Sequence, residues 1–278
     1  MSTQALHSTP PTPRWQAVAR EQFRAVGVAV RPEATLLAVL IATLSVLALV
    51  AIFRARQNPA HNPSLDLQPE MLIPAIFLAL LVPLSIWKSE EPSRRSYHWS
   101  MPVDRGVHTL TKNTSGWVWL MIAMVAFLLW GLLLALITGG DLGVERGQAI
   151  PAWRWIHPFV AATIGYLLAS AIVLASDHPW RWFAAIVLGF VLLTNILRAS
   201  ELNDLARGLQ SLWSGDWGLK VALTGSTEVP TEVTRRDGTT MIRLIDRPDF
   251  HAWIRAALLW LGIGTAGVVA AAYRHQER

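Results

Sequence analysis

The chain has 278 residues, of which 53% are hydrophobic and only 15% are charged. Soluble domains usually have about a quarter of their residues charged, so the composition excludes an ordinary soluble globular protein. The absence of cysteine excludes disulfides and thiolate metal sites, while 14 tryptophans favour contact with the border between hydrocarbon and water. The net charge of +5 therefore indicates basic residues placed around membrane segments rather than a nucleic-acid interface.

The N-terminal region has two parts with different composition. Residues 1–13 are rich in Ser, Thr and Pro, which predicts a disordered tail. In residues 14–31 apolar side chains recur at helical spacing, and Arg20, Arg24 and Arg31 lie on the opposite side. This pattern predicts an amphipathic helix in the membrane surface, with a solvated helix as the alternative.

Six stretches approach the roughly 20 apolar residues that a helix needs to cross a hydrocarbon core of about 30 Å. None has Asp, Glu, Lys, Arg or His in its interior. Because backbone groups in lipid must pair within their own segment, these stretches predict helices rather than strands. The predicted fold is an all-α polytopic membrane protein, in which residues 32–278 form one six-helix transmembrane domain. The predicted spans are residues 34–53, 71–87, 116–138, 159–175, 182–197 and 256–273.

The distribution of basic residues predicts the orientation of these spans. With the N-terminus inside, the cytoplasmic segments carry twelve Arg and Lys residues, and the short outer loops carry four. Positive charge accumulates on the cytoplasmic side, so both termini are predicted to be cytoplasmic. The long stretch between the fifth and sixth spans is left out of this comparison, because long translocated loops escape the rule.

Residues 199–252 are predicted to form a small extracytoplasmic element between the fifth and sixth spans. Leucine recurs with helical spacing in Glu201–Trp213, which predicts an amphipathic helix. Strand character follows in residues 217–224, 229–235 and 239–245, and Asp237-Gly238 predicts a hairpin turn between the last two.

The loop of residues 88–115 is basic and is predicted to be cytoplasmic. Pro102 suits the first turn of a short helix, in which Val103, Val107 and Leu110 form an apolar stripe. Such a helix is a docking element for a soluble partner. A solvated basic connector is the alternative interpretation.

This loop resembles the cytoplasmic loop of ABC-2 type permeases. The resemblance is carried by the run Arg95-Ser96-Tyr97-His98-Trp99-Ser100-Met101-Pro102-Val103-Asp104-Arg105, with Lys112 ahead of the third span. That family shows an aromatic-rich stretch, a Leu/Met-Pro-Val-Ser/Asp element and a later lysine, together with six spans. The resemblance implies a coupling helix that contacts a separate ABC ATPase, with two permeases and two ATPases in the complex. The implied contact residues are Met101, Pro102, Val103, Asp104, Arg105, Val107, Leu110 and Lys112.

The resemblance also implies an exporter in a bacterial inner membrane. The chain lacks the GxxxxGK[ST] phosphate loop, so ATP and Mg²⁺ are expected on the partner ATPase and no cofactor or catalytic residue on this chain. Uncharged spans argue against an ion-coupled carrier and favour an amphipathic, lipid-like or peptide substrate. The expected partners are the ATPase, a second identical or related permease, and membrane lipids. The spans also contain five polar residues that either line a substrate path or form hydrogen bonds with their own or a neighbouring helix: Thr43, Ser45, Thr163, Ser170 and Asn195.

The sequence offers three alternatives to a permease. Glu90-Glu91-Pro92-Ser93-Arg94-Arg95 matches the EExxxR motif of intramembrane CAAX-type proteases, but an FxxxH motif is absent and Pro92 favours a loop. A haem protein needs histidine within the spans, whereas His157 and His251 lie at predicted boundaries. A membrane sensor or scaffold, whose outer element binds a ligand, stays open as the main alternative to a permease.

Overall fold

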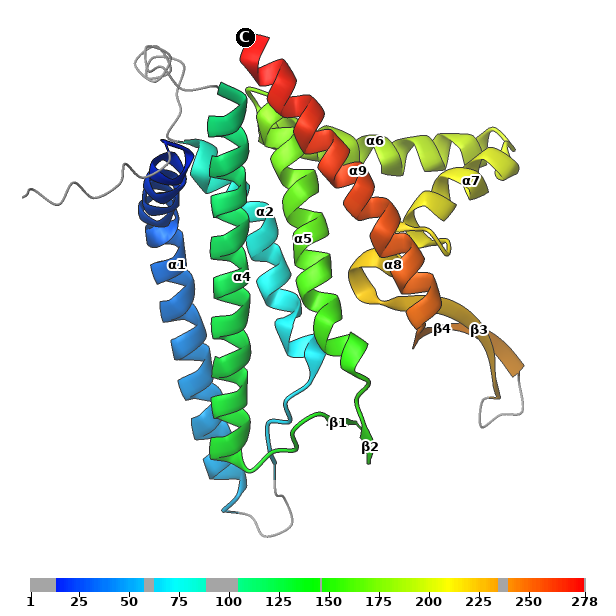
Figure 1. Cartoon of the computed structure of the whole chain (residues 1–278). Helices are drawn as coiled ribbons and strands as arrows, with labels where there is room; N and C mark the ends of the chain where they lie inside the picture. The colour runs from blue at the N-terminus through cyan, green and yellow to red at the C-terminus, as the bar shows by residue number, and fades with distance from the viewer. Residues whose placement is uncertain (1–13, 58–62, 89–104, 146, 235–239, 278) are drawn as a thin grey trace, which may run out of the picture.

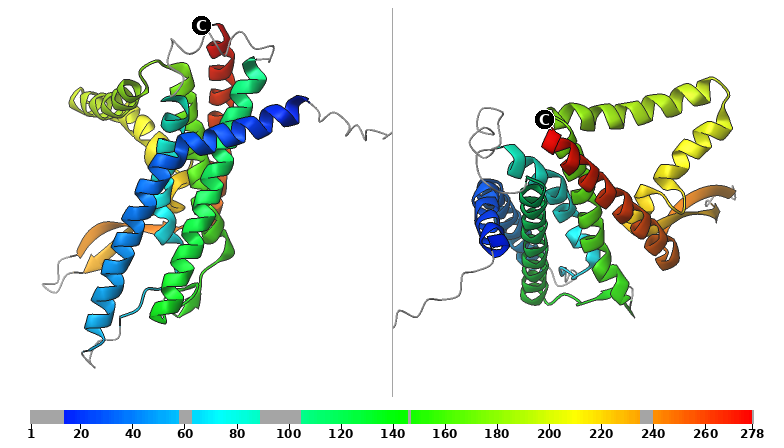
Figure 2. Two further views of the ribbon diagram at one scale, coloured as in Figure 1. Left: turned by 90° about the vertical axis from the view of Figure 1, so that its left-hand side faces the viewer. Right: turned by 45° about the horizontal axis from the view of Figure 1, so that its top comes forward.

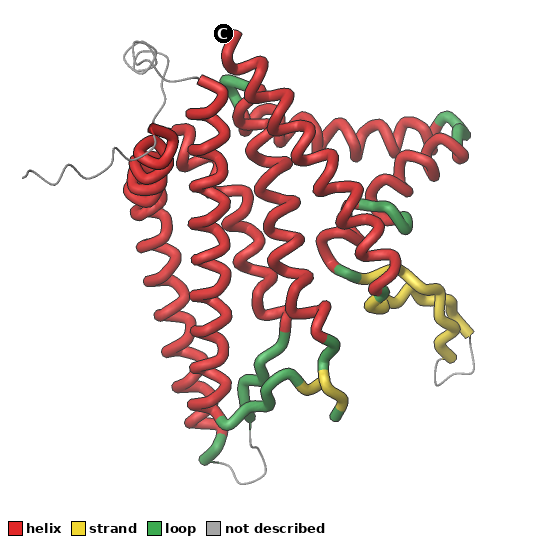
Figure 3. The backbone as a smooth tube through the Cα atoms, in the orientation of Figure 1, coloured by secondary structure: helices red, strands yellow, loops and turns green. Residues whose placement is uncertain are grey.

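A computed structural model of the chain describes residues 14–57, 63–88, 105–145, 147–234 and 240–277. Figures 1 and 3 show a bundle of long helices with two short hairpins. The tail predicted for residues 1–13 lies outside the described residues. The elements in chain order are α1 (Arg14–Ala55), η1 (Pro69–Leu72), α2 (Ile73–Lys88), α4 (Arg105–Thr138), β1 (Val144–Glu145), β2 (Gln148–Ala149), α5 (Ala152–Ala175), α6 (Pro179–Ala199), α7 (Asn203–Ser214), α8 (Leu219–Thr224), β3 (Ser226–Thr234), β4 (Thr240–Pro248) and α9 (Phe250–Glu277).

The six predicted spans are confirmed as helices. By length and composition, six helices among the described residues suit a membrane crossing: α1, α2 with η1, α4, α5, α6 and α9. They indicate a multi-pass membrane protein. Most helices run beyond the predicted spans, because a helix continues past its apolar stretch where water or protein satisfies its polar side chains. The 34 residues of α4 extend about 51 Å, against a hydrocarbon core of about 30 Å.

The first helix changes direction along its length. Its first part lies across one end of the bundle, and the rest runs alongside α4 (Figures 1 and 2). Pro32 lies inside α1. A proline there removes a backbone hydrogen bond and clashes with the preceding turn, which accounts for the bend. The predicted surface helix and the first span are therefore one helix with a proline between them.

The centre of the bundle is α5, which packs along α2 on one side and α9 on the other. Small residues allow the close approach. A Cβ on Gly264 of α9 would lie 2.8 Å from Leu167 Cβ, and one on Gly267 would lie 3.2 Å from Ala171 Cβ. These glycines therefore serve helix packing.

The helix that corresponds to the fifth predicted span is the least integrated. No residue of α6 is buried, and the helix runs crosswise to α5 and away from the bundle (Figures 1 and 2). Its contacts are with the returning α7 and the end of α5. The apolar surface of α6 is thus left to lipid or to another chain.

The segment between α6 and α9 combines helices with a hairpin. The predicted helix is confirmed as α7, and the predicted hairpin as β3 and β4, with Val229 opposite Ile245. The strand predicted for residues 217–224 is wrong, because this stretch contains the helix α8. Val221 and Ala222 are buried against α5 and α9, and Gly225 ends α8 at a φ of +67°.

An ion-pair cluster fixes the hairpin to α8. Lys220 Nζ lies 2.5 Å from Glu228 Oε1 on β3 and 2.9 Å from Asp246 Oδ1 on β4, and these two residues face each other across the strands. The hydrogen bond to Glu228, and then that to Asp246, raise the pKa of Lys220 above its ordinary value. The lysine therefore stays charged throughout the physiological pH range.

Replacement of Gly264 by alanine tests the packing of α9 against α5. We expect Gly264→Ala to destabilise the detergent-purified protein by about 1–3 kcal/mol, because the new methyl group overlaps Leu167. Gly262→Ala is the matched control, since a Cβ there meets no heavy atom within 4 Å. Thermal unfolding is the measurement. Equal melting temperatures for the two variants would contradict the packing.

Candidate functional site

The first turns of α4, the end of α2 and the bent part of α1 meet at one end of the bundle. We call this region the α2–α4 end. Both attachment points of the loop that resembles a coupling loop lie here, since α2 ends at Lys88 and α4 begins at Arg105. Four of the predicted contact residues lie outside the described residues: Met101, Pro102, Val103 and Asp104.

Residues 105–115 are not a separate short helix in the structure but the first turns of α4. This arrangement turns Lys112 inward. Its side chain is only 7% exposed, and Nζ lies 4.4 Å from the centroid of the Trp87 ring on α2. A desolvated cation over an indole is worth about 2 kcal/mol. Lys112 therefore joins α4 to α2, whereas the sequence interpretation placed it on the contact surface.

The opposite side of the same turns is apolar and open. Val107 and Leu110 are 46% and 42% exposed. Both were predicted to form part of the contact stripe, and they lie on the outer face of α4 between the loop and the membrane-spanning part. Of the predicted contact residues with described side chains, these two lie where a partner protein can reach them.

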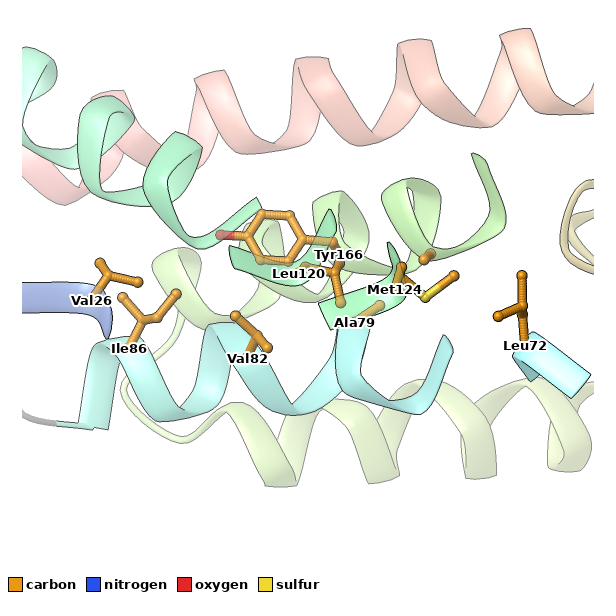
Figure 4. Packing of buried hydrophobic residues seen from close by; sticks show 9 residues of the cluster. Val26, Leu72, Ala79, Val82, Ile86, Leu120, Met124 and Tyr166 are labelled. Carbon is orange, nitrogen blue, oxygen red and sulfur yellow. The ribbon is translucent and has the colours of Figure 1, made fainter. Parts of the chain in front are cut away.

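A buried tyrosine ties α4 to α5 just below these turns. Tyr166 of α5 is fully buried, and its Oη donates to the Asn113 carbonyl oxygen at 2.6 Å and lies 3.1 Å from Asn113 Oδ1. Gly116 provides the space, because a Cβ there would lie 2.3 Å from Ile86 Cδ1 and 2.4 Å from Tyr166 Oη. Figure 4 shows Ile86 and Tyr166 in the same row of buried side chains as Leu120.

The bent part of α1 is attached to α4 by a second set of contacts. Phe23 and Trp119 stack with ring centroids 5.0 Å apart, and Trp119 Nε1 donates to the Phe23 carbonyl oxygen at 3.0 Å. Nearby, Gln22 Nε2 and His108 Nδ1 are hydrogen-bonded at 3.3 Å. The first part of α1 is therefore packed on the α2–α4 end.

The five residues proposed for a substrate path lie on three helices, α1, α5 and α6. Four of them, Thr43, Ser45, Thr163 and Asn195, donate to carbonyl oxygens one turn earlier in their own helices. Ser170 is fully buried within α5. In addition, Ser45 accepts a hydrogen bond from Trp130 at 3.0 Å and Thr163 accepts one from Trp117 at 3.1 Å. These contacts hold α4 to its neighbours, which the tryptophan content alone did not reveal.

The histidine expected at a span boundary lies inside a helix. His157 belongs to the candidate span α5 and is 8% exposed, with its ring 5.8 Å from that of Trp253. Within the described part of the chain, no group of three or more His, Cys, Asp or Glu residues is placed to hold a metal ion.

The two glutamates of the motif that matches CAAX-type proteases, Glu90 and Glu91, lie outside the described residues.

Comparison with models of protein families, with curated proteins and with solved structures finds no match to this chain.

Removal of the Tyr166 hydroxyl tests the attachment of α4 to α5. We expect Tyr166→Phe to lower the free energy of unfolding by about 0.5–1.5 kcal/mol, the usual net value of one hydrogen bond. The control is Tyr273→Phe, because Tyr273 is 67% exposed. Thermal unfolding in detergent measures both, and an equal loss in the control would remove the special role of Tyr166.

Proposed function

We propose that this chain is the membrane-spanning permease subunit of an ABC-2 type transporter, driven by a separate ATPase subunit. The observation that carries the proposal is the geometry of the α2–α4 end. There α4 continues about 11 residues beyond its apolar stretch. The two helices that flank the loop that resembles a coupling loop, α2 and α4, pack into one cluster and are joined by Lys112 over Trp87. A pull or push on this loop is thereby delivered to two candidate spans at once.

The division of labour between chain and partner supports the same proposal. The apolar stretches of the spans are uncharged, and the sequence lacks a phosphate-binding loop. A chain of this composition needs an external source of work. The resemblance to ABC-2 type permeases favours export, and the uncharged spans favour an amphipathic, lipid-like or peptide substrate. The helix α6, which has no buried residue, offers a surface for contact with a second permease copy.

We infer that the α2–α4 end is cytoplasmic in a bacterial inner membrane. The described start of α1, the attachment points of the loop and the C-terminus lie at this end (Figure 1). Exposed basic residues of the bent α1, Arg20 and Arg24, lie here as well and suit anionic headgroups. The β1–β2 and β3–β4 hairpins lie toward the opposite end, which we assign to the outer side.

Single cysteines test this topology, because the natural chain has none. We expect an impermeant maleimide to label Asp141→Cys in intact spheroplasts, since Asp141 follows the outer end of α4 and is exposed. Gln16→Cys, exposed on the bent part of α1, is expected to react only after permeabilisation. A gel shift of the labelled protein is the readout, and the reverse pattern would overturn the orientation.

Disruption of the exposed apolar strip on α4 tests the permease function. The tagged chain is purified from its native membranes, and associated subunits carrying a Walker-type ATPase domain are identified by mass spectrometry. We expect Val107→Asp combined with Leu110→Asp to reduce the recovered ATPase by about tenfold or more, because two half-exposed apolar contacts become charged.

The matched control is Leu244→Asp, which places a charge on a residue of the outer hairpin that is 60% exposed. It is expected to leave ATPase recovery unchanged. Two results would overturn the proposal: no ATPase with the natural chain, which favours a sensor or scaffold, or turnover of nucleotide by the isolated chain.

A further inference from the structure

A cavity of about 510 Å³ opens where α5 ends, α6 begins and α9 approaches its last turns. Figures 1 and 2 show these three helix ends converging near the C-terminus. The polar wall includes Arg181 from the first turn of α6, Arg274 from α9 and Asp177 from the connection between α5 and α6. It shares no lining residue with the cluster around Lys112, so it is a separate feature of the molecule.

Positive charge dominates the polar wall. Arg181 and Arg274 are both exposed, and in the described ranges neither guanidinium forms an ion pair. Asp177 contributes one negative charge against these two positive charges. Guanidinium groups present several donors in a fixed plane and match the oxygens of a phosphate or carboxylate. The wall therefore suits a ligand with a negatively charged head.

The facing wall is apolar and continues into the membrane-facing surface. It includes Ile172 of α5 together with Trp182 and Ile186 of α6, which are 57% and 52% exposed. Beyond Ile186, α6 presents apolar side chains without one buried residue. A ligand that only filled the polar wall would leave this surface uncovered, whereas an alkyl chain attached to the charged head would lie along it.

The position of the cavity matches the depth of lipid headgroups. It lies at the junction of the ends of the candidate spans α5, α6 and α9, next to Trp182 and to Trp180, which is 64% exposed. Tryptophan concentrates at this depth in membrane proteins. Headgroup phosphates at the same depth are within reach of two arginines on neighbouring helices.

We propose that this cavity binds the phosphodiester headgroup of an anionic membrane lipid. Arg181 and Arg274 donate to the phosphate oxygens from α6 and α9, and an acyl chain lies along Trp182 and Ile186. The bound lipid joins the start of α6 to the end of α9, which have no other extensive contact. The proposal requires only that the chain lies in a membrane, so failure of the ATPase experiment leaves it intact.

Native mass spectrometry of the detergent-purified full chain tests the proposal with two lipids that share the same acyl chains. These are 1-palmitoyl-2-oleoyl phosphatidylglycerol and the zwitterionic phosphatidylcholine. We expect phosphatidylglycerol to bind about tenfold or more tightly, because the choline cation opposes the two arginines. Equal binding of the two lipids would overturn the assignment of an anionic headgroup.

Arg181→Gln combined with Arg274→Gln is expected to weaken phosphatidylglycerol binding about tenfold or more, since two charge-assisted contacts are lost. Arg198→Gln combined with Arg207→Gln is the matched control. It removes the same charge from exposed positions at the far end of α6 and on α7, outside the cavity. Unchanged binding by the first pair, or equal weakening by both pairs, would refute a specific site. Unchanged melting temperatures verify folding.

A third arm separates a lipid from a soluble phosphate ester. Glycerol 3-phosphate carries the charged group without acyl chains and is offered in large excess over the lipid. We expect glycerol 3-phosphate to leave bound phosphatidylglycerol in place, because it has no acyl chain that could contact Trp182 and Ile186. Displacement by glycerol 3-phosphate would assign the cavity to a soluble phosphate ester and overturn the lipid proposal.

Discussion

The close packing of α5 between α2 and α9 is the interaction on which the bundle depends. In hydrocarbon, apolar helices gain nothing by hiding from water, so association depends on backbone approach and on hydrogen bonds between helices. The buried face of α5 is accordingly rich in small residues, among them Ala161, Ala162 and Ala169, with Gly165 close to Ala79 of α2. By contrast, no residue of α6 is buried, and this helix runs away from the bundle.

Polar groups then determine how α4 is held against this centre. Trp130 reaches Ser45 on α1, Trp117 reaches Thr163 on α5, and Tyr166 reaches Asn113 on α4. Each hydrogen bond satisfies a polar group that has no water to bond with in the hydrocarbon. The hydrogen bonds lie at different heights along α4, so the helix is fixed to its neighbours over its length. Small and polar residues therefore have complementary roles in the bundle.

The sequence predicted the features that depend on local pattern. The six uncharged apolar stretches and the leucine spacing of α7 each follow a pattern along the chain that packing does not change. The turn predicted at Asp237-Gly238 lies outside the described residues. Residues 219–224 fit both a strand and a helix, and the burial of Val221 and Ala222 decides for α8. The crosswise direction of α6 was not predictable, because it depends on how little of this helix packs against the bundle, and the apolar pattern of the sequence does not show that.

The inward position of Lys112 has a related cause and a functional consequence. The sequence predicts a border between the polar loop and the span at residue 116, yet one face of α4 crosses that border through Lys112, Gly116 and Leu120. Because Lys112 rests on Trp87 at the end of α2, the two ends of the loop are parts of one packed unit. In the proposed transporter, an ATPase that displaces the loop would therefore move α2 and α4 together against α5. In such a movement, the hydrogen bond between Tyr166 and Asn113 would limit how far α4 travels without separating from α5.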